Sequence, residues 1–276
     1  MIHEITFRCI STVKRLLDAS NPTEPRRTRV RRVLARSIDA ITHKVKPPRR
    51  DGLTLSAYGV WLTDRDEDAT FRFCVKGSYG FAYANVLRRR TSPYVLLDVG
   101  ANIGLYSLVA ARFSRASRVV AFEPDPTSAA LLRANARVNG VDVEIIEAAV
   151  SSTSGTATLY VPVGHSGAAS LRRQREDVTP VEVRKLSGSD LDEVLRASSG
   201  ETEVLVKLDV EGHEHEALQA LSQWIGWRDV RSVWVEFSRA TDVEACIELL
   251  ERAGFERVFS VGTRKHEDVL FERGRP

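Results

Sequence analysis

The segment from Tyr94 to Gly104 constrains the fold of this chain more than any other part of the sequence. A short apolar run ends at an acidic residue, Asp98, and is followed by a turn that contains Gly100 and Gly104. An apolar helical pattern then starts at once, at Leu105. This order predicts a buried strand, a glycine turn and a helix N-terminus, an arrangement that presents free backbone N–H groups to a ligand.

The spacing of the glycines indicates which kind of ligand this turn can hold. Enzymes that bind a dinucleotide through its pyrophosphate use G-x-G-x-x-G, in which the middle glycine lets the pyrophosphate come close. Here residues 100–104 read G-A-N-I-G, without such a middle glycine. A second strand-like run, Arg118 to Phe122, ends at Glu123, which is placed to accept hydrogen bonds from both hydroxyls of a ribose. The pattern therefore favours a nucleoside cofactor that has no pyrophosphate.

Strand-like and helix-like segments alternate through the rest of the chain, which predicts an α/β fold with a mainly parallel sheet and helices on both faces. The strands are expected at 94–99, 118–122, 142–147, 204–209, 231–237, 255–261 and 267–271. The helices are expected at 103–114, 126–139, 189–197, 213–225 and 241–253. A short polar loop joins the last two strands and predicts an antiparallel C-terminal hairpin. The alternation lapses between 148 and 188, where extra strands at 156–161 and 181–186 are expected around a loop at 164–175.

The residues before this pattern divide into two parts, so we expect boundaries at 1–50, 51–93 and 94–276. The first part is a strongly basic helical extension. It is either a cap with a solvated basic face or an element that contacts a membrane surface or a partner protein. The second part is expected to cover the cofactor, with Tyr79 as a lid residue or an ordinary packed tyrosine. It contains strand-like pieces at 53–62 and 70–75 and a helix at 81–90.

Composition and charge argue against several classes of protein. The net charge is +3, and because the N-terminal part is basic, the remainder is mildly acidic, which argues against a nucleic-acid substrate held through its phosphates. The three cysteines are far apart and form neither a disulfide framework nor a metal motif, as in a reducing compartment. No apolar run reaches the roughly eighteen residues of a membrane span, and the start of the sequence lacks a secretion-signal layout. We therefore expect a cytoplasmic protein.

Three motifs resemble the FkbM family of S-adenosylmethionine-dependent methyltransferases: D-V-G-A-N-I-G at 98–104, F-E-P at 122–124 and V-K-L-D-V-E-G-H-E at 206–214. The third motif is the specific one, since the first two suit most methyltransferases of this class. The resemblance implies a Rossmann-like class I methyltransferase fold with a seven-stranded sheet. It also implies that S-adenosyl-L-methionine is the cofactor.

The resemblance assigns cofactor contacts to the first part of the sheet. Asp98 would meet the methionine ammonium through its side chain or an ordered water, and Glu123 would hold the ribose, unless its charge only favours the following helix N-terminus. Glu147 and Ala148 close the third strand, where topology alone places the adenine edge. The other candidates in this group are the turn residues Gly100, Asn102 and Gly104.

The third motif carries the expected catalytic residues, Lys207, Asp209 and Glu211. Alternation along a strand would point all three to one side, at the sheet edge where ligands bind. Ionisable groups gathered in a cleft are costly unless they pair or act. Lys207 would hold both carboxylates ionised, and a carboxylate can take the proton of an attacking hydroxyl, with Asp209 favoured over Glu211. A structural ion-pair network is the alternative, and the two interpretations are compatible.

His213 follows in the same motif, but the spacing of H-E-H-E is not that of H-E-x-x-H, so no metal site is predicted. Acidic residues in the first turn of a helix need no metal to explain them. A divalent ion held by Asp209, Glu211 and His213 stays open as an alternative, as does His213 in the role of the base.

Acceptor contacts are expected from the small-residue loop that starts at Ser166, which resembles a feature of the family. Ser166 and Ser170 are its polar side chains. Arg172 and its neighbours would contact an anionic or sugar-bearing acceptor, or else form a solvated charge run. Glu236 closes a strand and points toward the same edge.

Together these features predict O-methylation of a hydroxyl on a sugar, a glycolipid, a polysaccharide or a secondary metabolite. Three alternatives stay open. An N-methyltransferase needs no strong base, because a neutral amine attacks unaided. An NAD-dependent oxidoreductase has the same kind of sheet, although the missing middle glycine argues against it. A non-catalytic module would keep the cofactor site as a scaffold or sensor.

Overall fold

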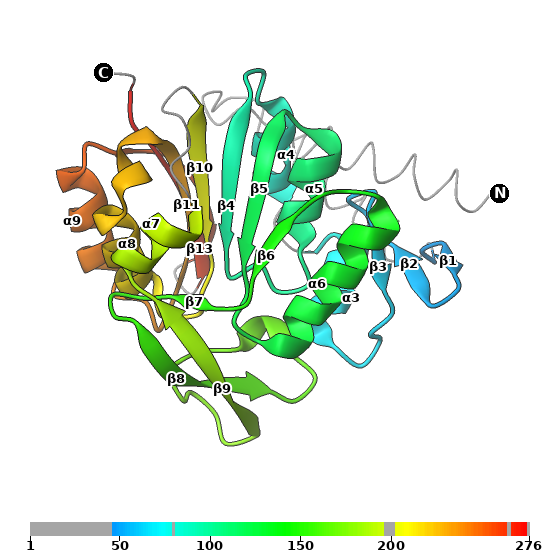
Figure 1. The fold of residues 1–276 in the computed structure, drawn as a ribbon. Coiled ribbons are helices and arrows are strands. Elements are labelled where there is room, and N and C mark those ends of the chain that lie inside the picture. The colour runs from blue at the N-terminus through cyan, green and yellow to red at the C-terminus, as the bar shows by residue number, and fades with distance from the viewer. Residues whose placement is uncertain (1–45, 79–80, 196–201, 264–265, 275–276) are drawn as a thin grey trace.

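A seven-stranded sheet forms the centre of the molecule (Figure 1). The structure is a computed structural model that describes residues 46–78, 81–195, 202–263 and 266–274. Its strands are β4 (Tyr94–Val99), β5 (Ala116–Phe122), β6 (Glu144–Ile146), β10 (Glu203–Leu208), β11 (Val230–Ser238), β12 (Glu256–Thr263) and β13 (His266–Glu272). They lie in the order β12-β13-β11-β10-β4-β5-β6. Strand β13 runs antiparallel to β11 and β12, and the other pairs are parallel. This is the class I methyltransferase topology, so the predicted fold class and C-terminal hairpin are confirmed.

Helices cover both faces of this sheet. One face carries α4 (Phe81–Arg89), α5 (Leu105–Phe113) and α6 (Pro126–Asn139), and the other carries α7 (Gly188–Leu195), α8 (Glu214–Gln223) and α9 (Val243–Arg252). A 3₁₀ turn, η2 (Ile225–Asp229), leads from α8 into β11. Alternate residues of β4 enter two separate cores, Val95 and Leu97 toward α8 and Tyr94 and Leu96 toward α5. Because both faces are covered, β4 is apolar on both sides rather than alternating.

A smaller sheet, with the strand order β7-β9-β8, stands beside the carboxyl ends of the central strands (Figure 1). It consists of β7 (Ala149–Val150), β8 (Gly155–Pro162) and β9 (Val178–Leu186). Strands β8 and β9 are antiparallel, so the extra strands predicted at 156–161 and 181–186 are confirmed. The connection between them, residues 163–177, contains a short 3₁₀ helix, η1 (Ser166–Ala168).

The segment before β4 differs from its prediction in one element. A small antiparallel sheet of β1 (Arg49–Arg50), β2 (Leu53–Leu55) and β3 (Trp61–Thr63) is followed by α3 (Ala69–Lys76), where a strand was expected at 70–75. That prediction is wrong because Asp68 caps the helix by accepting a hydrogen bond from the Phe71 N–H, and Gly77 ends it in the left-handed conformation. The helix predicted at 81–90 is confirmed as α4.

Two of the predictions fall outside the described residues. They concern the basic helices of residues 1–45 and the candidate lid residue Tyr79. Within the part of the chain that the structure describes, no helix combines the length and the apolar character that a membrane span requires.

Candidate active site

A cavity of about 230 Å³, the central cavity, lies at the carboxyl ends of β4 and β10. Strand β4 lies between β5 and β10 in the sheet. The strand order reverses at this point, because β5 and β6 extend the sheet on one side of β4 and β10 is added on the other. Ligands of open α/β sheets bind at such a switch in strand order. The central sheet supplies one wall through the residues that follow β4, β5, β6 and β10. The opposite wall consists of α3 and the 163–177 connection, through residues that include Thr70, Phe73, His165 and Ser166.

Gly100 lets the end of β4 lie directly against the end of β10. Its φ is 76°, and a Cβ atom at this position would lie 1.9 Å from the backbone oxygen of Asp209. Gly104, with φ 88°, would place a Cβ atom 1.9 Å from Leu132 Cδ1 of α6. Gly100 and Asn102 line the central cavity, whereas Gly104 packs behind it. A glycine is therefore required at both positions by contact as well as by backbone conformation.

The backbone N–H groups of this turn are mostly bonded within the protein. Gly100 and Ala101 both donate to the carbonyl of Phe122 at 3.0 Å, and Asn102 donates to Glu123 Oε2 at 2.7 Å. The prediction of free N–H groups is wrong for these three residues, because the turn folds over the end of β5. What the turn offers to a ligand is the part of the cavity wall that Gly100 and Asn102 form.

Glu123 lies in the wall of the central cavity and is 5% exposed. Its Oε1 accepts a hydrogen bond from the Asp125 N–H at 2.8 Å, and its Oε2 accepts the one from Asn102. Burial raises the pKa of Glu123 to about 7, although the two N–H donors oppose this shift. A carboxylate oxygen that has accepted one hydrogen bond can accept another, so both oxygens can still receive ligand hydroxyls.

Asp98 lies beneath the central cavity rather than in its wall. The side chain is fully buried, and its Oδ2 accepts hydrogen bonds from the N–H and the hydroxyl of Ser107 at 3.0 and 2.6 Å. Its Oδ1 lies 3.5 Å from Lys207 Nζ. Asp98 is not among the residues that line the cavity, so its contacts are with the protein itself.

Lys207 links the two halves of the sheet. Its Nζ donates to the Gly100 carbonyl at 2.7 Å and lies 3.4 Å from Asp209 Oδ2. Burial alone would lower the pKa of Lys207, but the carboxylates of Asp209, Asp98 and Glu236 raise it above its usual value. The ammonium therefore stays charged, and the predicted ion-pair network exists around it.

A turn, and not strand β10, determines the position of the Glu211 side chain. Strand β10 ends at Leu208, so the alternation expected to carry Lys207, Asp209 and Glu211 to one side does not reach Glu211. Instead Glu211 has φ 51° and Gly212 has φ 96°, and a Cβ atom on Gly212 would come within 2.7 Å of Ala240 Cβ. These two left-handed residues turn the chain sharply and bring Glu211 to the cavity wall.

The carboxylate of Glu211 makes no hydrogen bond or ion pair with any described residue. Burial raises its pKa to about 8, and the nearby charges of Asp209 and Glu214 add to the shift. Glu214, by contrast, is fully engaged: it accepts hydrogen bonds from the Gly212 N–H at 3.0 Å and from Thr241 Oγ1 at 2.7 Å. Glu211 is thus a carboxylate with free lone pairs facing a cavity.

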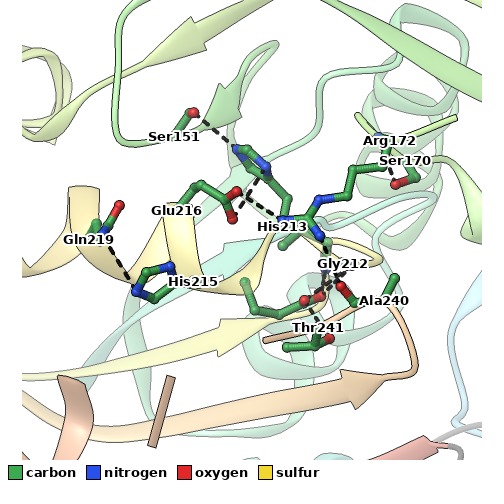
Figure 2. A network of polar contacts seen from close by, with 12 residues as sticks. Ser151, Ser170, Arg172, Gly212, His213, His215, Glu216, Gln219, Ala240 and Thr241 are labelled. Atoms are coloured by element: carbon green, nitrogen blue, oxygen red, sulfur yellow. Dashed lines mark hydrogen bonds and ion pairs between the residues drawn. The ribbon is translucent and has the colours of Figure 1, made fainter. Parts of the chain in front are cut away.

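His213 also lines the central cavity, but its ring is engaged on both sides (Figure 2). Its Nε2 lies 3.0 Å from Ser151 Oγ and its Nδ1 lies 3.7 Å from Glu216 Oε2. Burial lowers the pKa of His213, so the ring is neutral near pH 7. Among the described residues no three His, Cys, Asp or Glu side chains are arranged to hold a metal ion.

Hydrogen bonds to the N-terminal end of α3 and to the turn after β4 hold the 163–177 connection over the cavity. The Ser166 N–H donates to Asp68 Oδ2 at 2.8 Å, and the Ser166 hydroxyl donates to Asn102 Oδ1 at 3.3 Å. The Gly167 N–H donates to Thr70 Oγ1 at 2.8 Å. Ser166 therefore lines the central cavity, as expected of an acceptor-facing loop.

Ser170 and Arg172 line a second cavity of about 250 Å³, the side cavity, and not the central one. The Ser170 hydroxyl donates to the Glu211 carbonyl at 2.7 Å. The Arg172 guanidinium donates to the Ala240 carbonyl at 3.2 Å and lies 3.1 Å from Glu216 Oε1 (Figure 2). Both residues hold neighbouring segments together, so Arg172 is not a free cation.

Three further candidates complete the comparison with the sequence. Ala148 lines the central cavity, whereas Glu147 does not, because its side chain pairs with Arg133 at 2.9 Å on the exposed side. Glu236 lines the central cavity, with Oε1 3.8 Å from His266 Nδ1.

Sequence reasoning did not name several other residues that line the cavity: Thr70, Phe73, Tyr106, His165 and His266. Asp68, placed just before α3, was a usable signal for the first two, since aspartate is a preferred N-cap residue. Tyr106 lies beneath Lys207, whose Nζ is 5.6 Å from the ring centroid, and no local pattern marks it.

Two named methyltransferases are similar to this chain in sequence. "Methyltransferase sdnD" of Sordaria araneosa is 30% identical over 195 residues, which cover 60% of this chain and 74% of that protein. "Hexuronic acid methyltransferase AglP" of Haloferax volcanii is 29% identical over 184 residues, which cover 66% of this chain and 70% of that protein. A solved structure of an rRNA methylase from Streptococcus thermophilus aligns with a TM-score of 0.44 and 12% identity over 70% of this chain and 95% of that chain.

The family comparison covers most of the site. The family described as "Methyltransferase FkbM domain" matches residues 98–257, more than half of the chain. This range starts at Asp98 and includes the glycine turn, Glu123 and the Lys207 to Glu214 segment. The chain therefore belongs to the FkbM family and is an S-adenosylmethionine-dependent methyltransferase.

Proposed function

We propose that this enzyme methylates a hydroxyl group of a sugar, a glycolipid, a polysaccharide or a secondary metabolite, and that Glu211 receives the hydroxyl proton. One observation carries the proposal: Glu211 lines both the central cavity and the side cavity. A carboxylate at that junction lies between a cofactor in one cavity and an acceptor in the other. The name of the relative from Haloferax volcanii, a hexuronic acid methyltransferase, supports a sugar as the acceptor.

The residues of the central cavity suit S-adenosylmethionine. Glu123 has an acceptor oxygen available for each of the two ribose hydroxyls, and Gly100 lines the same cavity. When bound, the cofactor supplies a methyl group activated by a positively charged sulfur. Asp98 lies behind the wall, and we assign it the role of holding Lys207 and Ser107 rather than a ligand contact.

The choice between the two candidate bases follows from their surroundings. Asp209 is paired with the Lys207 ammonium at 3.4 Å, so its Oδ2 already has a cationic partner. Glu211 has no such partner among the described residues, and burial raises its pKa to about 8. A base acts best when its pKa lies near the working pH. We therefore favour Glu211 as the base and propose that Asp209 balances the charge of Lys207. The sequence alone favours Asp209 over Glu211 as the base.

The protein's part in the reaction is alignment and proton removal. The acceptor oxygen forms its bond to the methyl carbon as the bond from that carbon to sulfur breaks, and the hydroxyl proton passes to the Glu211 carboxylate. Holding the two reactants in line supplies much of the acceleration in such a transfer. Because the base must be ionised, the rate should rise with pH up to about the pKa of Glu211, which is about 8.

The test is methyl transfer from S-adenosylmethionine to a panel of neutral sugars, acidic sugars, amino sugars and phenols, measured as release of S-adenosylhomocysteine. We expect transfer to a hydroxyl, and we expect Glu211→Gln to lower kcat by about 10²–10⁴-fold while the affinity for S-adenosylhomocysteine stays the same. Glu176→Gln is the matched control, since Glu176 is exposed on the 163–177 connection. If Glu211→Gln keeps its activity, or if amino groups are methylated in preference to hydroxyls, the proposal fails and an N-methyltransferase is favoured.

A further inference from the structure

The side cavity contains charged groups that the transfer of a methyl group does not require. It shares His165, Glu211 and His266 with the central cavity, so the two spaces adjoin. Three arginines also line it, and Glu211 is the acidic side chain among its described lining residues. The side cavity is therefore a basic space next to the base.

The three arginines are not equivalent. Arg172 is held by Glu216 and by the Ala240 carbonyl (Figure 2). Arg175 and Arg239 line the same cavity, and neither makes a hydrogen bond or an ion pair with any described residue. Two guanidinium groups without such partners, next to a third cation, leave their donors available for an anion.

The two available arginines come from segments that the structure fixes in place. Arg175 belongs to the 163–177 connection, whose nearby Gln174 donates to the Glu211 carbonyl at 3.1 Å. Arg239 directly follows β11, and the next residue, Ala240, accepts the hydrogen bond from Arg172. These contacts join the residue before Arg175 to Glu211 and the residue after Arg239 to the 163–177 connection.

We propose that Arg175 and Arg239 bind an anionic group of the acceptor, a carboxylate or a phosphate, so that the acceptor is an acidic sugar or a similarly charged molecule. This inference rests on the proposed function, because it names the substrate class of the same site. The anion occupies the side cavity, and the hydroxyl to be methylated lies at Glu211, where the two cavities meet. Tyr160 and Pro162 supply an apolar wall for the body of the acceptor.

The experiment uses the full chain saturated with S-adenosylhomocysteine and measures the binding of D-glucuronate, D-glucose 6-phosphate and D-glucose by ligand-observed NMR at matched ionic strength. We expect at least one of the two anions to bind about tenfold or more tightly than glucose. The preferred anion then distinguishes a carboxylate from a phosphate. Arg175→Gln and Arg239→Gln should each weaken its binding by about 5- to 50-fold. Arg173→Gln is the control, since Arg173 is exposed and lines neither cavity.

Other outcomes overturn the inference. Equal binding of glucose and both anions would do so, as would the absence of anion binding or an equal loss in Arg173→Gln. Failure of the proposed function is recognised separately. In that case S-adenosylhomocysteine fails to bind, or Glu211→Gln keeps its activity, while the anion still binds in an arginine-dependent way. The affinity for S-adenosylhomocysteine should be the same in all three arginine variants, which shows that each has folded.

Discussion

At the scale of single residues, backbone conformation marks the site as clearly as side-chain chemistry does. Three described residues other than glycine have a positive φ, namely Asp51, Asn102 and Glu211. Two of them, Asn102 and Glu211, line the central cavity. Such a conformation costs on the order of 1–3 kcal/mol in a residue with a side chain and persists where the surrounding structure enforces it. For Glu211, Gly212 and its contact with Ala240 provide that enforcement.

The raised pKa of Glu211 predicts how Glu211→Gln changes stability with pH. The carboxyl has a pKa of about 8 in the folded protein against an ordinary 4.5, so the folded state favours the protonated form. Its contribution to the free energy of unfolding is complete below the ordinary pKa and is lost as the pH rises toward the folded-state value. Glutamine does not ionise, so we expect the variant to be the more stable protein at about pH 9, by roughly 1–3 kcal/mol, and similar to wild type at about pH 4.

Urea unfolding across this pH range measures that difference, with Glu176→Gln as the exposed control. A constant difference between Glu211→Gln and wild type at every pH would mean that Glu211 ionises in the folded protein as it does in the unfolded one.

At the scale of elements, the site depends on the close approach of β4 and β10. Gly100→Ala and Gly254→Ala test this contact as a pair, since both positions have a positive φ, of 76° and 80°. A Cβ atom would meet the Asp209 carbonyl at the first position and open space at the second. We expect Gly254→Ala to cost about 1 kcal/mol from backbone strain, and Gly100→Ala to cost roughly 2 kcal/mol more from overpacking. Chemical denaturation gives both values, and equal losses would contradict the close approach.

The hydrogen bond between Thr70 and Gly167 gives a second prediction at this scale. Thr70→Val keeps the shape of the side chain but leaves the Gly167 N–H without its acceptor, which costs about 1–3 kcal/mol where the group is buried. We expect faster amide hydrogen exchange across the 163–177 connection and weaker binding of S-adenosylhomocysteine. Thr70→Ser keeps the hydroxyl and should behave like wild type. If valine and serine give the same exchange rates, the connection is held by other contacts.

The elements also show what sequence predicts and what it does not. Apolar runs such as Tyr94 to Leu97 predict the central strands because both faces of the sheet are covered. Helix α3 was missed because Thr70 to Val75 is rich in residues that favour strands, and the cap at Asp68 outweighs that preference. The motif predicted that Lys207 and Asp209 would meet, since they belong to one strand end and its continuation. The position of the Glu211 side chain depends on the turn at Gly212, and a strand pattern cannot predict that turn.

At the scale of the whole molecule, the two halves of the chain form different parts of the site. The strands β4 to β6 and the turns after them build the wall around Glu123, and the segments after β10 and β11 bring Glu211 and Arg239 to the opposite part of the site. The 163–177 connection joins them through Arg172, which reaches both α8 and the residue after Arg239 (Figure 2). Such contacts link segments far apart in sequence, so the acceptor side could not be predicted in detail while the fold could.

Calorimetric titration with S-adenosylhomocysteine tests the central claim, that the cofactor lies over the carboxyl ends of β4 and β5, most directly. Glu123 and Glu147 follow neighbouring strands, but only Glu123 lines the cavity, while Glu147 forms an exposed pair with Arg133. We predict that Glu123→Ala weakens binding by about 10- to 100-fold, as the loss of hydrogen bonds to a charged group requires. We predict that Glu147→Ala binds as wild type does, since exposed pairs contribute little. Unchanged binding in Glu123→Ala, or an equal loss in both variants, would contradict this placement of the cofactor.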